Sequence, residues 1–281
     1  YLPQGCPPTM WILAVYILTF TVGFPANIFT FAILLGKARR RLSPSDILLL
    51  NLTAADLLLL LFLPFKMAEA AADLTWPLPT VLCPVANFCF YSSIYLSSLF
   101  LAALSVERYL GVVFPLQYKD RRRPGRVMAV SVVLWLLACS HCSIVFVAQY
   151  HGGDDQPTAN ACYDDFSEGQ LSFVLPLRLE LFLVLFLLPF AVTVFCYVNF
   201  VRVLLARPNI PLEKKQRAVG LAVATMINFG VCFAPYNVSH VVGFVEKRSP
   251  SWRVYVLLLT SLNAALDPVI FYFSSTAVQR A

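Results

Sequence analysis

The stretch VLPLRLELFLVLFLLPF (174–190) is almost entirely apolar, yet it carries Arg178 and Glu180. A charged side chain in such a segment costs about 2.5–3.5 kcal/mol by insertion scales unless something pairs with it. Three further donor side chains lie in apolar stretches elsewhere in the chain: Arg253, His240 and His141. Two guanidinium groups and two imidazoles suit an anion, and the fork of a guanidinium binds both oxygens of a carboxylate. The residue types therefore indicate a carboxylate site, provided that the fold brings these side chains together.

Membrane-spanning helices must position these side chains, because the composition is that of a membrane protein. Of the 281 residues, 59% are hydrophobic and 13% are charged, about half the charged fraction of a soluble domain. Stretches of the roughly 20 apolar residues that cross ~30 Å of hydrocarbon recur along the whole chain. We predict seven spans, at residues 10–36, 46–72, 80–114, 126–149, 171–206, 215–244 and 253–274. The predicted fold class is an all-α membrane protein, a seven-transmembrane helix bundle formed by one domain over residues 1–281, with termini that look trimmed.

The distribution of charge predicts the orientation of the chain in the membrane. The net charge is +6, and basic residues cluster in the connections after spans 1, 3 and 5. The connection after span 4 is acidic and has no lysine or arginine; its acids are Asp154, Asp155, Asp164, Asp165 and Glu168. Because lysine and arginine favour the cytoplasmic side, we expect the N-terminus outside and the C-terminus inside. The basic residues follow this rule, so nucleic acid is not an expected partner.

Two of the eight cysteines are predicted to form a disulfide. Cys83 begins span 3 from the outer side and Cys162 lies in the acidic outer connection, so both face the oxidising side of the membrane, where disulfides persist. Five cysteines lie within spans, where such small polarizable side chains usually pack. Cys6, near the outer terminus, has no assigned partner.

The depths of the four donor side chains favour one outer cavity. Arg178 lies eleven residues before Pro189, and Arg253 lies fourteen residues before Asp267, which places both toward the outer side. His240 and His141 lie five and six residues beyond Pro235 and Trp135 in their own spans. Structural ion pairs are the alternative, with the arginines paired to acids in the outer connections or span 2: Glu69, Asp164, Asp165 or Glu168. Glu180 lies roughly 200° around the helix from Arg178, so we expect it to meet a neighbouring helix instead.

Two aspartates form a second polar group within the spans. Asp56 lies in NLTAADLLLL of span 2, and Asp267 lies in SLNAALDPVIFYF of span 7. Buried acids need a cation, a proton or another partner. With Ser97 and Asn263 they would form an allosteric sodium-type site, and a proton shared between the two acids is the alternative. We expect no other cofactor.

Span 3 ends on LSVERYLGVVFP, which contains Glu107, Arg108 and Tyr109. Taken alone, the arginine could simply extend to the cytoplasmic head groups. With the other polar residues and prolines, however, the chain resembles the rhodopsin-like class of G-protein-coupled receptors. The residues that carry the resemblance are Asn27, Asp56, Cys83, Glu107, Arg108, Tyr109, Trp135, Cys162, Pro189, Tyr197, Pro235 and Pro268. It implies a plasma-membrane receptor in which the three span-3 residues and Tyr197 act as the switch toward a heterotrimeric G protein, of Gi or Gq type, and arrestin.

Three positions depart from the pattern of that class. The tryptophan usual in span 6 is replaced by Phe233, and the usual NPxxY motif reads Asp267-Pro268-Val269-Ile270-Phe271. Phe271 has no hydroxyl to contact Tyr197, and Tyr272 points about 100° away around the helix. Span 7 also lacks the lysine that a retinal-binding light-driven pump would need.

Further stretches, including PLRLEL, PYNVSHVVGF, SPSWRV and FYSSIYLS, are similar to the free fatty acid receptors, specifically to their two short-chain members. This resemblance implies that Arg178, Arg253 and His240 hold the carboxylate of a short-chain fatty acid such as acetate, propionate or butyrate. It also implies a pocket lined by family positions that match Tyr91, His141, Tyr163 and Tyr236. Membrane lipid is the remaining expected partner.

Other functions remain open at this point. A receptor for longer fatty acids or for another carboxylate metabolite would use the same anion chemistry. A carboxylate transporter is a further alternative, although the two halves of the chain show no inverted repeat. No catalytic arrangement is apparent, so an enzyme is not expected.

Overall fold

The computed structural model describes residues 8–121, 124–150, 162–163 and 166–274, and in these ranges the regular elements are helices. Seven segments are long and apolar enough to cross a membrane, as predicted. They are α1 (Pro8–Arg40), α2 (Pro44–Ala71), α3 (Leu82–Val113), α5 and α6 (Pro124–Cys142 and Ile144–Tyr150), α7, η1 and α8 (Glu168–Phe182, Leu183–Leu187 and Leu188–Ala206), α9 (Leu212–Glu246) and α10 (Arg253–Ser274). The short helix α4 (Pro115–Arg121) lies in a connection for which no helix was predicted.

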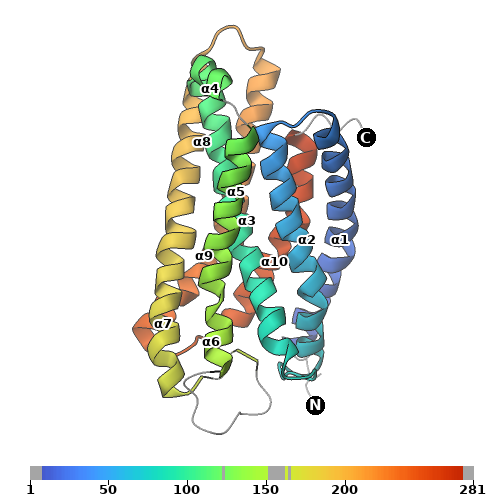
Figure 1. The fold of residues 1–281 in the computed structure, drawn as a ribbon, viewed down its shortest axis with the longest axis vertical. Helices are drawn as coiled ribbons and strands as arrows, with labels where there is room; N and C mark the ends of the chain where they lie inside the picture. Colours follow the sequence, from blue (N-terminus) through green and yellow to red (C-terminus); the bar gives the residue numbers. More distant parts are fainter. Residues whose placement is uncertain (1–7, 122–123, 151–161, 164–165, 275–281) are drawn as a thin grey trace, which may run out of the picture.

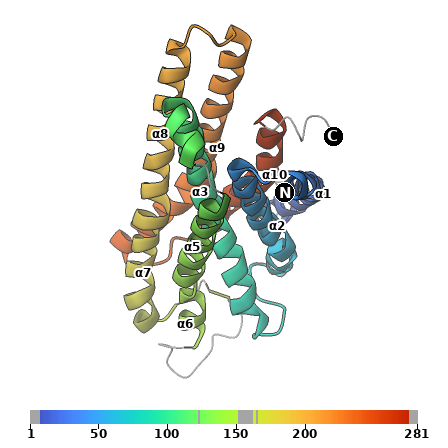
Figure 2. The same ribbon diagram turned by 45° about the horizontal axis from the view of Figure 1, so that its top comes forward.

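The seven segments run along the long axis of the molecule (Figure 1). α3 is the central helix: it packs against α2, α5, α6 and α8, and its span is the most deeply buried of the seven. α1 and α10 close one side of the bundle against α2, and α9 packs between α8 and α10 (Figure 2). The start of α1 and the end of α10 lie at opposite ends of the bundle, as an odd number of spans requires.

Polar side chains within the spans fix neighbouring helices to one another. The side-chain amide of Asn27 on α1 donates to the backbone oxygen of Gly23 and to that of Ala264 on α10, both at 2.8 Å. The indole of Trp135 on α5 donates to Asn51 on α2 at 2.9 Å. Inside lipid such groups have no water to bind, so each pair stabilises one packing of the bundle.

A break in one helix has a clear cause in the sequence. Pro189 has no backbone N–H, so the α-helical acceptor four residues earlier loses its donor. The preceding turn, Leu183–Leu187, is a π-helix, with the N–H of Leu188 donating to the oxygen of Leu183. Single π-helical turns within an α-helix often lie near functional sites. Here the π-helical turn lies between Pro189 and the part of α7 that carries Arg178.

Candidate anion-binding site

A small cavity lies near the end of the bundle that contains the Cys83–Cys162 disulfide, called below the disulfide end. Side chains from α3, from α5–α6, from α7, from α9 and α10, and from the segment after Cys162 line it. Those that concern the predicted site are Tyr91, Tyr95, Tyr163, Arg178, Tyr236, His240 and Arg253. The structure thus brings both arginines and the span-6 histidine together. The cavity has a volume of about 10 Å³, which is room for about one water molecule.

Arg178 is 2% exposed and its guanidinium is only partly satisfied. Nη1 donates to the hydroxyl of Ser249, in the connection between α9 and α10, at 3.1 Å. The guanidinium carbon lies 5.3 Å from the ring of Tyr163 and 5.2 Å from that of Phe166. Nε and Nη2 have no hydrogen-bond partner among the described residues. These two nitrogens share one edge of the guanidinium, the edge that binds a carboxylate with two parallel hydrogen bonds.

Arg253 is the first residue of α10 and is also 2% exposed. Its guanidinium lies among three aromatic rings, 5.0 Å from Tyr91, 5.6 Å from Tyr236 and 5.8 Å from Tyr163. Nη2 donates to the hydroxyl of Tyr236 at 3.5 Å. Aromatic faces stabilise a cation without neutralising its charge, so the two buried arginines keep the cavity electropositive.

His240 completes a chain of polar groups that begins on α3. Its Nε2 lies 2.7 Å from the hydroxyl of Tyr95, which in turn lies 3.3 Å from the hydroxyl of Tyr236. Nδ1 is buried and has no partner among the described residues. In the tautomer with the imidazole proton on Nδ1, the hydroxyl of Tyr95 donates its hydrogen bond to Nε2 instead of to Tyr236, and Nδ1 can donate to an anion.

Tyr163 follows directly after the disulfide and has φ = 63°, in the left-handed region that a bulky residue rarely adopts. Its buried ring packs 5.5 Å from Tyr91 and 5.2 Å from Phe166. Burial raises the pKa of the Tyr163 hydroxyl above its usual value, although both arginines act to lower it. The phenol therefore stays neutral near pH 7 and can serve as a hydrogen-bond donor.

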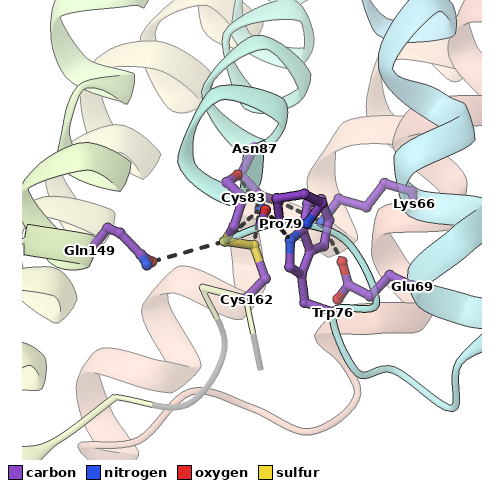
Figure 3. Close-up of a disulfide and its surroundings, with 8 residues drawn as sticks. All are labelled: Lys66, Glu69, Trp76, Pro79, Cys83, Asn87, Gln149 and Cys162. Atoms are coloured by element: carbon purple, nitrogen blue, oxygen red, sulfur yellow. Dashed lines mark hydrogen bonds and ion pairs between the residues drawn. A yellow bond between two sulfur atoms is a disulfide. The ribbon is translucent and has the colours of Figure 1, made fainter. Parts of the chain in front are cut away.

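The disulfide anchors this segment to two helices (Figure 3). Cys83 and Cys162 are bonded, as predicted. Asn87 donates to the sulfur of Cys162 at 2.7 Å and accepts from Nζ of Lys66 at 2.7 Å. Lys66 in turn lies 3.7 Å from the carboxylate of Glu69 on the same helix. α2, α3 and the residue before Tyr163 are thus held together at the edge of the cavity.

The predicted convergence of His141 on this cavity is not what the structure shows. Nδ1 of His141 contacts the backbone oxygen of Leu137 at 2.7 Å, and Nε2 contacts Glu180 Oε1 at 2.9 Å. Both residues line a separate groove between α5–α6 and α7. His141 lies six residues beyond Trp135, but on a face of the helix that points to α7 instead of the cavity. Glu180 meets a neighbouring helix, as its angle from Arg178 predicted.

Structural ion pairs are the alternative role for the two buried arginines. Glu69 is held by Lys66, and Asp164 and Asp165, like Cys6, Asp154 and Asp155, lie outside the described residues. Within the described ranges, no carboxylate lies within 4.0 Å of the Arg178 guanidinium. The predicted anion site therefore retains hydrogen-bonding capacity at Arg178.

The residues predicted for a sodium-type site also lie together, in the middle of the bundle. Ser97 donates to Oδ1 of Asp56 at 2.9 Å, and Asn263 donates to Oδ1 of Asp267 at 3.3 Å. Oδ2 of each acid has no donor among the described residues. Two carboxylate oxygens without donors beside a hydroxyl and an amide oxygen fit a small cation, and they also fit a shared proton.

A third predicted group lies toward the opposite end of α3. Nη1 of Arg108 donates to the hydroxyl of Tyr197 on α8 at 2.7 Å. Glu107 accepts a hydrogen bond from Ser45 on α2 at 3.5 Å, and Tyr109 packs against Phe195 and Phe114. On α10, the ring of Phe271 is buried and Tyr272 is half-exposed, as their spacing predicted.

The prediction missed three residues of the anion site. Tyr95 lies four residues after Tyr91, on the same face of α3, so the spacing in FYSSIYLS contained its signal. Ser249 and Phe166 lie in connections, and nothing in the sequence pattern places either beside Arg178. Asn228, which donates to Asp267 at 3.5 Å, was likewise missed in the aspartate group.

Comparisons with known proteins identify the family of the chain. Residues 26–271 match the family described as 7 transmembrane receptor (rhodopsin family). The chain is similar to free fatty acid receptor 3 of Homo sapiens, with 49% identity over 271 residues that cover 96% of this chain and 78% of that receptor. Free fatty acid receptor 2 of Mus musculus is 52% identical over 274 residues, covering 96% of this chain and 83% of the relative. Free fatty acid receptor 1 of Macaca fascicularis is 36% identical over 279 residues, covering 94% and 91%.

Proposed function

The chain belongs to the free fatty acid receptors within the rhodopsin family of seven-transmembrane receptors, and on this premise we propose that it is activated by short-chain fatty acid carboxylates. As a member of this family it is a multi-pass plasma-membrane protein and a G-protein-coupled receptor, not an enzyme. The disulfide end faces outward in this proposal, since α6 ends and α7 begins there, on either side of the acidic stretch of the sequence, and α1, α8 and α9 have their basic ends at the other end.

One observation carries the proposal: the Nε–Nη2 edge of Arg178 is buried and has no partner among the described residues. A desolvated guanidinium edge is costly unless an acceptor binds it. A carboxylate would satisfy both nitrogens, with Nδ1 of His240 as a further donor and Arg253 as a second positive charge. Acetate, propionate and butyrate present this group at minimal volume.

The small cavity supports short chains over long ones. Its volume of about 10 Å³ must increase for any ligand to bind, and each added methylene requires further displacement of packed side chains. A very small ligand also has few atoms to contribute binding energy, at most roughly 1.5 kcal/mol per heavy atom. We therefore expect micromolar-to-millimolar potency, dominated by charge-assisted hydrogen bonds.

Nucleotide exchange on a purified G protein, with a panel from acetate to decanoate, tests the proposal. Activation by the two- to four-carbon acids, with potency falling at longer chains, is the expected result. Maximal potency at eight or ten carbons would identify a receptor for longer fatty acids instead. Uptake of labelled acetate into receptor liposomes without any nucleotide exchange would identify a transporter. Running the exchange panel with Gi and with Gq proteins assigns the G protein. Agonist-dependent binding of arrestin is measured separately.

A further inference from the structure

Glu180 is an ionisable residue within a membrane-length segment, and it does not line the anion cavity. It lies on α7, twelve residues into the 39-residue segment Glu168–Ala206, which is long and apolar enough to cross a membrane. Its side chain is 46% exposed. In water such exposure would be unremarkable, but a carboxyl group facing hydrocarbon costs several kcal/mol unless it has partners, and it marks a functional site by default.

The contacts of His141 determine how many protons the pair carries. Nδ1 lies 2.7 Å from the backbone oxygen of Leu137, which can only accept, so Nδ1 carries a proton. Nε2 lies 2.9 Å from Oε1 of Glu180, and two such atoms approach this closely only with a proton between them. Imidazole with a proton on Nδ1, carboxylate and one shared proton together carry no net charge. The pair is therefore neutral overall, whichever of the two groups holds the shared proton.

The surrounding groove offers hydrogen-bond acceptors and has aliphatic walls. It has a volume of about 260 Å³ and lies between α5–α6 and α7. The hydroxyls of Ser140 and Ser143 line it, and both donate to backbone oxygens, at 3.0 and 2.5 Å, which leaves their oxygens as acceptors. Oε2 of Glu180 adds another acceptor. Ile144 and Leu181 form both the inner wall of this groove and part of the anion cavity, so the two hollows are separate but adjacent.

We propose that the Glu180–His141 groove is a binding site for a membrane sterol, whose hydroxyl donates to Oε2 of Glu180. The groove offers hydrogen-bond acceptors but no free donors, so a ligand must carry a donor in its head group. Because the Glu180–His141 pair has no net charge, it does not favour a cationic amine over a hydroxyl. The rigid ring system of a sterol loses little conformational entropy against the aliphatic walls of Val147, Leu177 and Leu181. This site lies outside the anion cavity and does not depend on the proposed carboxylate response.

The test compares three variants in phosphatidylcholine nanodiscs, using a photoreactive cholesterol and mapping the labelled peptides. Glu180→Leu removes both carboxyl oxygens, whereas Glu180→Gln keeps the shape and one carbonyl acceptor. Glu168→Leu is the matched control, because it removes the other acid of α7, which does not line the groove. In the wild type we expect labelling at 140–147 and 177–181 that competes with cholesterol and not with cholesterol 3-methyl ether, which lacks the donor.

Loss of one hydrogen bond to a charged or shared-proton acceptor predicts that labelling falls about fivefold or more in Glu180→Leu. Glu180→Gln should retain part of the labelling, and Glu168→Leu should match the wild type. Equal labelling of Glu180→Leu and wild type would overturn the proposal, as would equal competition by the methyl ether. Competition by a long-chain amine at lower concentration than cholesterol would also overturn it, in favour of a cationic amphiphile. A thermal-unfolding scan of each variant confirms that the labelled protein is folded.

Discussion

Arg178 on α7 donates to the hydroxyl of Ser249 at 3.1 Å, and Ser249 lies in the short connection between α9 and α10. Lys247 ends α9 in the left-handed conformation, and the N–H of Arg248 donates back to the oxygen of Gly243 at 3.2 Å. A Cβ at position 243 would lie 3.0 Å from the oxygen of Arg248, so the close return of the chain depends on glycine. The helix ends thus fix Ser249, and Ser249 fixes one nitrogen of the arginine.

This geometry predicts that the Ser249 hydroxyl positions the guanidinium for a carboxylate. Ser249→Val removes the hydroxyl, and Ser249→Thr is its isosteric partner with the hydroxyl retained. We expect acetate potency in a nucleotide-exchange assay to fall about tenfold in Ser249→Val, the value of one charge-assisted hydrogen bond, and to stay near wild type in Ser249→Thr. Ser251→Ala, an exposed serine in the same connection, is the control. Equal potencies for the Val and Thr variants would show that the hydroxyl has no such role.

Both arginines of the cavity should be required for carboxylate agonists. Each alanine variant removes a charge-assisted interaction from a desolvated anion, a loss of about 2–5 kcal/mol, or tens- to thousands-fold in potency. Arg178→Lys and Arg253→Lys keep the charge but lose the fork, so they should recover little. The measurements are surface expression, acetate response and response to an uncharged agonist. Normal expression with only the acetate response lost supports the site, whereas low expression with both responses lost supports a structural ion pair.

The elements and the arginine cluster could be predicted from the sequence because membrane helices obey strong local rules. Hydropathy and helix length set the spans to within a few residues, and the positions of Pro189 and Pro235 gave the depths of Arg178 and His240. The failure at His141 has a physical cause: depth along a helix says nothing about which face a residue occupies. A histidine and a carboxylate on adjacent helices were both available at that depth, and they paired.

The connections were the least predictable part of the site. Ser249 and Tyr163 depend on left-handed residues at Lys247 and at position 163 itself, which carry no pattern in the sequence. The role of Phe166 beside Arg178 depends in turn on where the disulfide places that segment. Tertiary contacts, not local propensity, determine these positions.

The aspartate pair predicts a sodium effect on agonist binding. A cation held by Asp56 and Asp267 would stabilise one packing of α2, α3 and α10, and coupling of this kind is typically ~1–3 kcal/mol. We expect agonist affinity to be lower, by about fivefold or more, in sodium than in a large organic cation, and the difference to vanish in Asp56→Asn. Radioligand competition in the two salts measures it. Equal affinities in both salts, with a dependence on pH alone, would show that the acids share a proton instead.

Arg108 is expected to be the switch that couples the bundle to its G protein. Its 2.7 Å hydrogen bond to Tyr197 joins α3 to α8, and the guanidinium carbon lies 5.9 Å from the Tyr197 ring. Because Phe271 has no hydroxyl, it cannot share in this contact, so Tyr197 should matter more for holding the arginine. Arg108→Ala should abolish nucleotide exchange while agonist binding changes less than about threefold, since the anion cavity lies toward the disulfide end. Tyr197→Phe should reduce exchange and leave binding intact, and full signalling by Arg108→Ala would show that the arginine only extends to the lipid head groups.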